Sequence, residues 1–251
     1  MALKISVIPT VRIMKLTHID TLCWQDILGD DNVKYQYLTI ESIAMISSIG
    51  LAYFVVIIIA MHKLRPDYHP RSRYISEYAV GEYGQLAASS LVFYGLAILG
   101  INLCLHTILP DRAQSNIGLT LIAIWGVSVV ITGFFDTDLK AEKMSLHGTV
   151  HVIASNTGVA ASALGLTFLS FSFTLNDSTQ SIAFITQTIA VVAIILAVLL
   201  LLGLLGDMAL KYHHKVHGLL LSLLKLTGLT ERLLLGISVV WLTIIVHLIT
   251  K

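Results

Sequence analysis

The stretch from Phe134 to Gly165 reads FFDTDLKAEKMSLHGTVHVIASNTGVAASALG and joins a polar turn to a long apolar helix. His147 and His151 stand four residues apart, so their imidazoles share one face of that helix. The same face continues with small and hydroxyl-bearing residues, namely Ser155, Gly158, Ser162 and Gly165. Because small side chains let a neighbouring helix approach closely in a membrane, the stretch predicts a bundle with both histidines turned toward its interior.

The composition of the whole chain is typical of an integral membrane protein. Of the 251 residues, 56% are hydrophobic and 12% are charged, whereas an average soluble domain carries about 25% charged residues. Six apolar runs reach the roughly 20 residues that a helix needs to cross a bilayer. The sequence therefore predicts an all-α, polytopic membrane protein with six transmembrane helices. With a formal net charge of +1 and no dense basic cluster, we expect no nucleic-acid partner.

The expected spans divide the chain into a short N-terminal segment and one membrane domain. Residues 38–251 are predicted to form a six-helix transmembrane domain, with spans at about 38–62, 85–109, 117–135, 145–173, 182–206 and 231–250. Residues 1–37 mix basic and apolar side chains, which favours either an amphipathic helix on the membrane surface or a partly ordered tail. His217 to Thr230 is apolar but too short to cross, so a second interfacial or re-entrant helix is expected there, broken by Gly228.

The distribution of Lys and Arg predicts the orientation. The loops after the first, third and fifth spans hold 10 of the 16 basic residues. By the positive-inside rule these loops are cytoplasmic, which leaves both termini on the non-cytoplasmic side of the cell (inner) membrane. The polar-rich segments then belong to one side of the membrane.

Ionisable residues within or close to the membrane usually face a cavity or a partner, so these segments are expected to form one polar site. Its expected members are Ser76, Glu77, Asp136, Asp138, His151, Glu231 and Arg232. The same residues have simpler interpretations. Asp136 and Asp138 favour turns and helix N-caps, and a glutamate such as Glu231 suits the positive start of a helix.

The histidine pair raises the question of a metal. His147 and His151, with Asp138 from the adjacent turn, make a possible Zn²⁺ ligand set with an open position for water. The alternative is that the histidines form hydrogen bonds across the bundle or cap a helix end. The cluster His213, His214 and His217 is likewise either a metal site or a solvated loop. No cofactor is certain, and zinc is the candidate.

Four short motifs carry a resemblance to a known family. They are Ile75-Ser76-Glu77, Phe135-Asp136-Thr137-Asp138, Gly148-Thr149-Val150-His151 and Gly228-Leu229-Thr230-Glu231-Arg232. Over about residues 40–250 the chain resembles a prokaryotic integral-membrane family catalogued as domain of unknown function number 998. The resemblance implies a six-span fold and singles out Ser76, Glu77, Asp138, His151, Glu231 and Arg232. Asp136 replaces the family's usual proline and His147 is an addition, which weakens the resemblance as support for a metal site.

Two functions compete at this stage. The first is a non-catalytic bundle, either an accessory subunit of a larger membrane complex or a binder of small ligands or membrane lipids at a cytoplasm-facing polar site. The alternative is an intramembrane zinc-dependent hydrolase of a lipid-like substrate, with Glu77 as general base on a bound water. A carrier is less well supported, because the middles of the spans hold no carboxylate.

Overall fold

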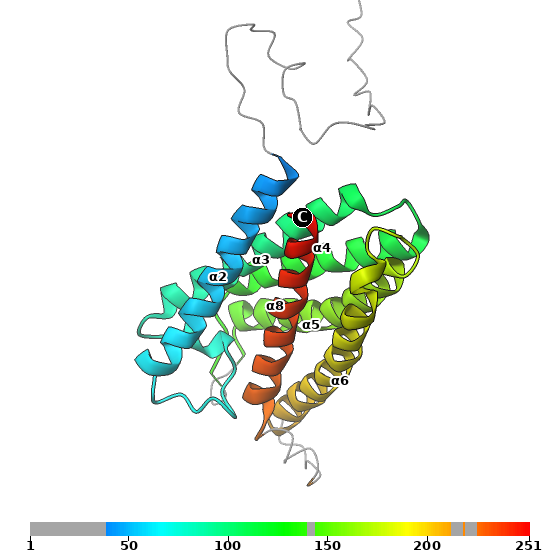
Figure 1. Ribbon diagram of the computed structural model, residues 1–251. Coiled ribbons are helices and arrows are strands. Elements are labelled where there is room, and N and C mark those ends of the chain that lie inside the picture. The colour runs from blue at the N-terminus through cyan, green and yellow to red at the C-terminus, as the bar shows by residue number, and fades with distance from the viewer. Residues whose placement is uncertain (1–38, 140–143, 212–217, 219–224) are drawn as a thin grey trace, which may run out of the picture. The chain divides into compact units, whose positions relative to one another are not determined.

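The computed structural model describes residues 39–139, 144–211, 218 and 225–251 (Figure 1). The chain divides into two units, Met1–Ile40 and Glu41–Lys251, and the cavity and contacts discussed below lie in the second. Within the described ranges, six helices are long and apolar enough to cross a membrane, which confirms the all-α, six-span prediction. These helices are α2 (Ile40–Leu64), α3 (Gly84–Ile108), α4 (Ala113–Phe134), α5 (Leu146–Phe173), α6 (Gln180–Lys211) and α8 (Thr227–Ile249).

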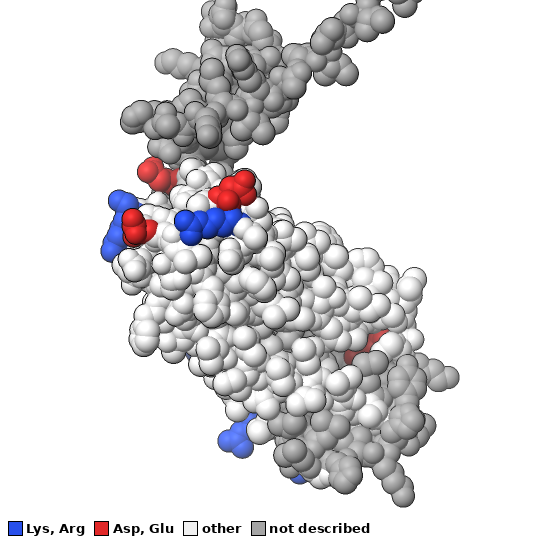
Figure 2. All heavy atoms as spheres, turned by 90° about the vertical axis from the view of Figure 1, so that its right-hand side faces the viewer, with Lys and Arg blue, Asp and Glu red and all other residues white. Residues whose placement is uncertain are grey.

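The outer face of the bundle is apolar. Large hydrophobic side chains are strongly exposed there, among them Phe184 at 83%, Ile49 at 69% and Phe134 at 68%. Figure 2 shows that Lys, Arg, Asp and Glu gather toward the ends of the visible face and leave a broad uncharged band between them. Such a band is the surface that a helical bundle needs in order to lie in hydrocarbon.

Close helix packing depends on small residues. A Cβ atom added to Gly158 of α5 would lie 3.1 Å from the Cβ of Ser128 in α4, and one added to Gly165 would lie 2.8 Å from Ile122. A Cβ on Gly95 of α3 would lie 2.7 Å from the Gly126 carbonyl oxygen in α4. The small-residue face predicted for α5 therefore packs on α4, as expected for helices that associate by close backbone approach.

The helix ends differ from prediction at two places. Helix α8 begins at Thr227, four residues earlier than the expected start at 231, so Gly228 lies in its first turn. Helix α6 continues beyond the expected end at 206 and includes Asp207. Both differences arise because the adjoining α2–α3 loop packs on these turns and supplies partners for their polar groups.

The predicted interfacial helices lie mostly outside the described residues, as do residues 1–37 and the histidines His213, His214 and His217. The loop between α2 and α3 holds an element that was not predicted, a short 3₁₀ helix, η1 (Ser76–Ala79). Helix η1 packs on α3 and α4, and α8 lies against α6 (Figure 1). Helix α8 also reaches α2 through a hydrogen bond between Arg232 and His62. The polar loops thus meet at one end of the bundle.

Candidate functional site

A cavity of about 450 Å³ lies inside the bundle at the end where these loops meet. Helices α3, α4, α5, α6 and α8 form its walls, together with η1 and the two loops beside it. Four carboxylates line it, Glu77, Asp138, Asp207 and Glu231. The remaining wall combines hydroxyl groups with apolar side chains, including Ser128, Thr132, Ser155, Ser162, Ser238, Trp125, Leu200, Leu204 and Leu234.

A segment of the α2–α3 loop, residues 71–75, crosses the first turn of α8, and we call it the strap. The backbone N–H of Leu229 donates to the Arg71 carbonyl at 3.1 Å. A Cβ atom on Gly228 would lie 2.3 Å from the Arg73 carbonyl oxygen and 2.7 Å from that of Pro70. Only glycine allows this contact, which also gives one of the orphan N–H groups at the helix start a partner.

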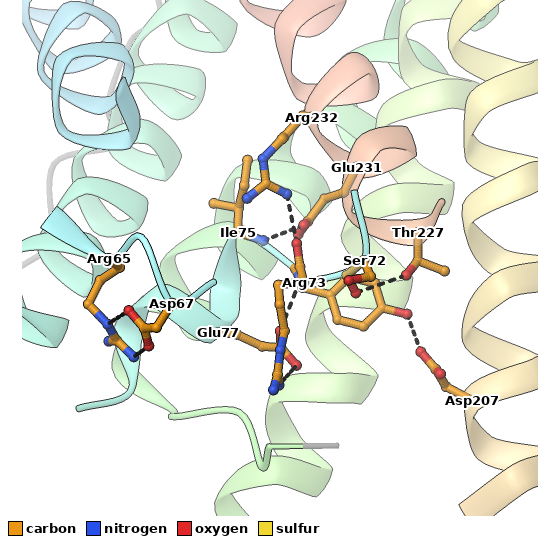
Figure 3. A network of polar contacts seen from close by, with 11 residues as sticks. Arg65, Asp67, Ser72, Arg73, Ile75, Glu77, Asp207, Thr227, Glu231 and Arg232 are labelled. Carbon is orange, nitrogen blue, oxygen red and sulfur yellow. Dashed lines mark hydrogen bonds and ion pairs between the residues drawn. The ribbon is translucent and has the colours of Figure 1, made fainter. Parts of the chain in front are cut away.

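Side chains from the second turn of α8 complete the contact with the strap. The Glu231 carboxylate accepts a hydrogen bond from the Ile75 N–H, and the Arg232 guanidinium donates to the Arg73 carbonyl at 2.7 Å (Figure 3). The Ile75-Ser76-Glu77 and Gly228-to-Arg232 motifs are therefore linked by direct contact. This pairing gives a structural reason for both motifs.

Arg232 serves this contact and does not line the cavity. It also donates to His62 Nε2 at 3.0 Å and to the Tyr78 hydroxyl at 3.2 Å. His62 Nδ1 lies 2.6 Å from the Ile58 carbonyl, so Nδ1 carries the proton and Nε2 accepts from the arginine. Among the described residues, no carboxylate forms an ion pair with Arg232. Its charge is accommodated by carbonyl, imidazole and phenol groups instead.

Glu77 lies at the inner edge of the strap and is 1% exposed. Its carboxylate accepts from the Tyr74 N–H at 3.1 Å and from Arg73 Nη1 at 3.4 Å. The Tyr74 hydroxyl donates in turn to the Asp207 carboxylate (Figure 3). Burial, together with the nearby negative charge of Asp207, raises the pKa of the Tyr74 phenol, so this hydroxyl keeps its proton and acts as donor.

Asp138 lies in the α4–α5 loop, beside the start of α5. Its Oδ2 accepts from the Ser145 N–H at 2.7 Å, and the Ser145 hydroxyl accepts from the Gly148 N–H at 2.9 Å. A Cβ atom on Gly148 would overlap the Asp138 carboxylate, so the glycine makes room for it. The N-cap of α5 is therefore Ser145, while Asp138 binds the backbone N–H of that residue from the loop and also lines the cavity.

His151 lies one turn further along α5, and 2% of it is exposed. Its Nδ1 is 2.7 Å from the Phe135 carbonyl at the end of α4. Because a carbonyl can only accept, Nδ1 carries the proton, and Nε2 of the neutral ring is an acceptor. This is the hydrogen bond across helix ends that was the alternative to metal binding.

The remaining predicted residues are placed differently. Ser76 lines the cavity, whereas Asp136 is exposed and outside it. His147 is also exposed, and its ring packs against Phe135 with centroids 5.3 Å apart. Of the proposed zinc ligands, only His151 and Asp138 line the cavity. Nowhere in the described part of the chain do three His, Cys, Asp or Glu side chains form a group suited to a metal ion.

Among the cavity residues that the sequence analysis did not name as site members are Asp207, Tyr74 and Tyr94. Asp207 directly follows the longest apolar run, and Tyr74 precedes the Ile75-Ser76-Glu77 motif, so both carried a positional signal. Tyr94 is fully buried between Phe54, with ring centroids 4.3 Å apart, and Trp125, at 5.9 Å. Its hydroxyl has no hydrogen-bond partner among the described residues. Such a group is uncommon in a folded protein and requires an explanation.

An apolar six-helix bundle with a polar cavity at one end defines a polytopic integral membrane protein. Residues 48–248 match the profile of a family described as protein of unknown function DUF998. The chain belongs to this family. The corresponding searches find no match among curated proteins and none among solved structures.

Proposed function

We propose that this protein binds a small amphiphilic ligand, a membrane lipid or a lipid-like molecule, in the cavity of its helical bundle. The observation that carries the proposal is the cavity itself, which combines four carboxylates with an apolar, hydroxyl-bearing wall. Its volume of about 450 Å³ lies within the roughly 300–1,000 Å³ usual for small-ligand pockets. No reaction is required of such a protein, which could also act as an accessory subunit of a larger membrane complex.

The depth of the cavity supports an amphiphile. Ser238 lines it and follows the first residue of α8, Thr227, by 11 positions. At a rise of about 1.5 Å per residue this corresponds to about 16 Å, or about half of a hydrocarbon core of roughly 30 Å. A ligand in this cavity would have a polar head among the loops and an apolar part near the middle of the membrane.

The ligand head would face the cytoplasm. This orientation rests on the excess of Lys and Arg in the loops after the first, third and fifth spans. Two of these loops contribute residues to the cavity: the α2–α3 loop contributes Glu77, and the α4–α5 loop contributes Asp138. Labelling of single cysteines introduced at Lys63 and Arg112 in intact cells tests the orientation, because the proposal requires that only the Arg112 position react with an impermeant reagent.

A zinc-dependent hydrolase is less well supported. His151 and Asp138 both line the cavity, but His147 packs on Phe135 outside it, and the described residues supply no third ligand. Glu77 would have to act as base while it holds Arg73 and the Tyr74 N–H. These contacts favour a binding role.

Native mass spectrometry of the purified full chain tests the proposal. Ala154 is 7% exposed and lines the cavity, so Ala154→Phe fills it, whereas Ala52→Phe makes the same change on the exposed face of α2. We expect a co-purifying amphiphile on the wild type and on Ala52→Phe, and at least tenfold lower occupancy on Ala154→Phe. Both variants must remain monodisperse. Equal ligand occupancy of Ala154→Phe and Ala52→Phe would refute binding in the cavity.

A further inference from the structure

Resting on the proposed function, we propose that the ligand head is an ammonium group that binds among the carboxylates of the cavity. Glu77, Asp138, Asp207 and Glu231 come from four different parts of the fold: η1, the α4–α5 loop, α6 and α8. Among the described lining residues there is no Lys or Arg, and of the four carboxylates Glu77 pairs with Arg73, at 3.4 Å, from outside the lining. A site lined by carboxylates on several sides favours a cation over an anion or a neutral head.

The hydroxyl groups of the wall add to this acceptor character. Four of these hydroxyls donate their protons to carbonyl groups of their own helices: Thr132 to Val129 at 2.7 Å, Ser155 to Val152 at 3.2 Å, Ser162 to Val159 at 2.8 Å and Ser238 to Leu234 at 2.7 Å. A hydroxyl that donates within its helix has only its lone pairs left to offer a ligand. The wall is therefore rich in acceptors, and the complementary ligand is a donor.

Two further groups bear on the ligand: one is an acceptor, and the other requires a polar partner. The Nδ1 proton of His151 points to the Phe135 carbonyl, which makes Nε2 an acceptor in the neutral ring. The Tyr94 hydroxyl is fully buried on the cavity wall and has no partner among the described residues. Tyr94 is an observation independent of the acidic residues, because a buried hydroxyl without a partner is costly unless a bound polar group satisfies it.

A primary ammonium group on a single apolar chain matches these features. It supplies three N–H donors and a positive charge, while the chain contacts the leucines of the deeper wall, Leu200, Leu204 and Leu234. The same chemistry occurs in the ethanolamine head of a membrane lipid and in a free long-chain amine. The inference concerns the ammonium group that both share.

The test compares three probes with the same alkyl chain and different heads: dodecylammonium, dodecanol and dodecanoate. The full chain, in phosphatidylcholine nanodiscs at pH 7, is titrated with each probe, and native mass spectrometry measures the fraction carrying one molecule. Phosphatidylcholine is a suitable background because its quaternary ammonium has no N–H donor. We expect at least tenfold tighter binding of dodecylammonium than of the alcohol or the carboxylate.

Each outcome bears on a different claim. Equal binding of the three probes, or a preference for dodecanoate, would overturn the inference and leave the proposed amphiphile site standing. Binding of none of them would overturn both. Nanodiscs that contain phosphatidylethanolamine identify the source of the head, since competition with dodecylammonium supports a lipid head and lack of competition supports a free amine.

Charge-neutralising variants locate the site. Asp207→Asn and Glu231→Gln keep the shape and an acceptor oxygen, while Asp67→Asn makes a similar change in an exposed carboxylate outside the cavity that pairs with Arg65 at 3.0 Å. We expect the preference for dodecylammonium over dodecanol to fall at least threefold in each cavity variant and to persist in Asp67→Asn. If the cavity variants retained the full preference, the assignment would be wrong. The probe comparison on the wild type decides the matter even if a variant fails to fold.

Discussion

Helices α8 and α5 each have a glycine in their first turn. Each of these glycines lies against a polar group of a loop. At Gly228 of α8 the obstacle to a Cβ atom is the backbone of the strap, and at Gly148 of α5 it is the carboxylate of Asp138. The backbone of the strap is fixed by several hydrogen bonds, whereas a carboxylate can rotate away. The start of α8 therefore holds the loops together, and the start of α5 presents an adjustable charged group to the cavity.

Gly228→Ala should have the largest effect. The new Cβ would lie 2.3 Å from the Arg73 carbonyl oxygen, so strap and helix would have to separate and lose their shared hydrogen bonds. We expect a loss of about 3 kcal/mol, in line with overpacking at a buried position, measured as a lower thermal midpoint in detergent.

Gly236→Ala is the matched control for this substitution. Gly236 lies in the same helix, is exposed, and has no atom within 4 Å of an added Cβ. Alanine is the better helix former by about 1 kcal/mol, so this variant should be as stable as the wild type or slightly more stable. Equal destabilisation by the two substitutions would show that the strap contact does not matter.

Arg232→Lys should have the next largest effect. Lysine keeps the positive charge but lacks the planar fork that reaches the Arg73 and Gly228 carbonyls, His62 and Tyr78 together. With hydrogen bonds to charged groups contributing about 1.5–3 kcal/mol each, we expect a net loss of about 2 kcal/mol by thermal unfolding. Arg112→Lys, at an exposed arginine that caps α4 without a side-chain bond, is the control and should leave the midpoint unchanged.

Gly148→Ala should affect the cavity more than the fold. The new Cβ displaces the Asp138 carboxylate, which can rotate but then loses its bond to the Ser145 N–H. Loss of one exposed hydrogen bond costs about 1 kcal/mol, a smaller change than at Gly228. Dodecylammonium binding should fall at least threefold, measured as described above. A Gly148→Ala protein as unstable as Gly228→Ala would remove the distinction between the two helix starts.

The sequence predicted the six spans because the need for about 20 apolar residues is a strong constraint on composition. It did not predict what Arg232 binds, since two of the four partners of its guanidinium are backbone carbonyls, and a carbonyl has no signature in the sequence. Asp207 was missed because the fifth span was expected to end at the preceding glycine, Gly206. The metal hypothesis depended on the helical spacing of His147 and His151, but which of them reaches the interior depends on how α5 packs on α4.

The lack of a partner for Tyr94 could not be predicted either, because it depends on every neighbour of the hydroxyl at once. Substitution of Tyr94 gives the smallest predicted effect, and that effect is a gain in stability, whereas the other substitutions, apart from their controls, lower stability. Tyr94→Phe removes the hydroxyl but keeps the ring stacked on Phe54 and against Trp125. A buried polar group without a partner costs about 1–3 kcal/mol, so the ligand-free variant should be more stable by about 1 kcal/mol.

A ligand reverses this advantage if it supplies the missing hydrogen bond. At a saturating dodecylammonium concentration, the wild type should gain more thermal stability than Tyr94→Phe, because binding stabilises the folded state in proportion to the logarithm of affinity. Tyr53→Phe is the control, since the Tyr53 hydroxyl already bonds Ser89 at 2.9 Å and lies outside the cavity. If Tyr94→Phe were less stable than the wild type without ligand, its hydroxyl would have a partner in the empty protein. Tyr94 would then give no support to a polar ligand. The inference of an ammonium head would rest only on the carboxylates and on the hydroxyl groups that line the cavity.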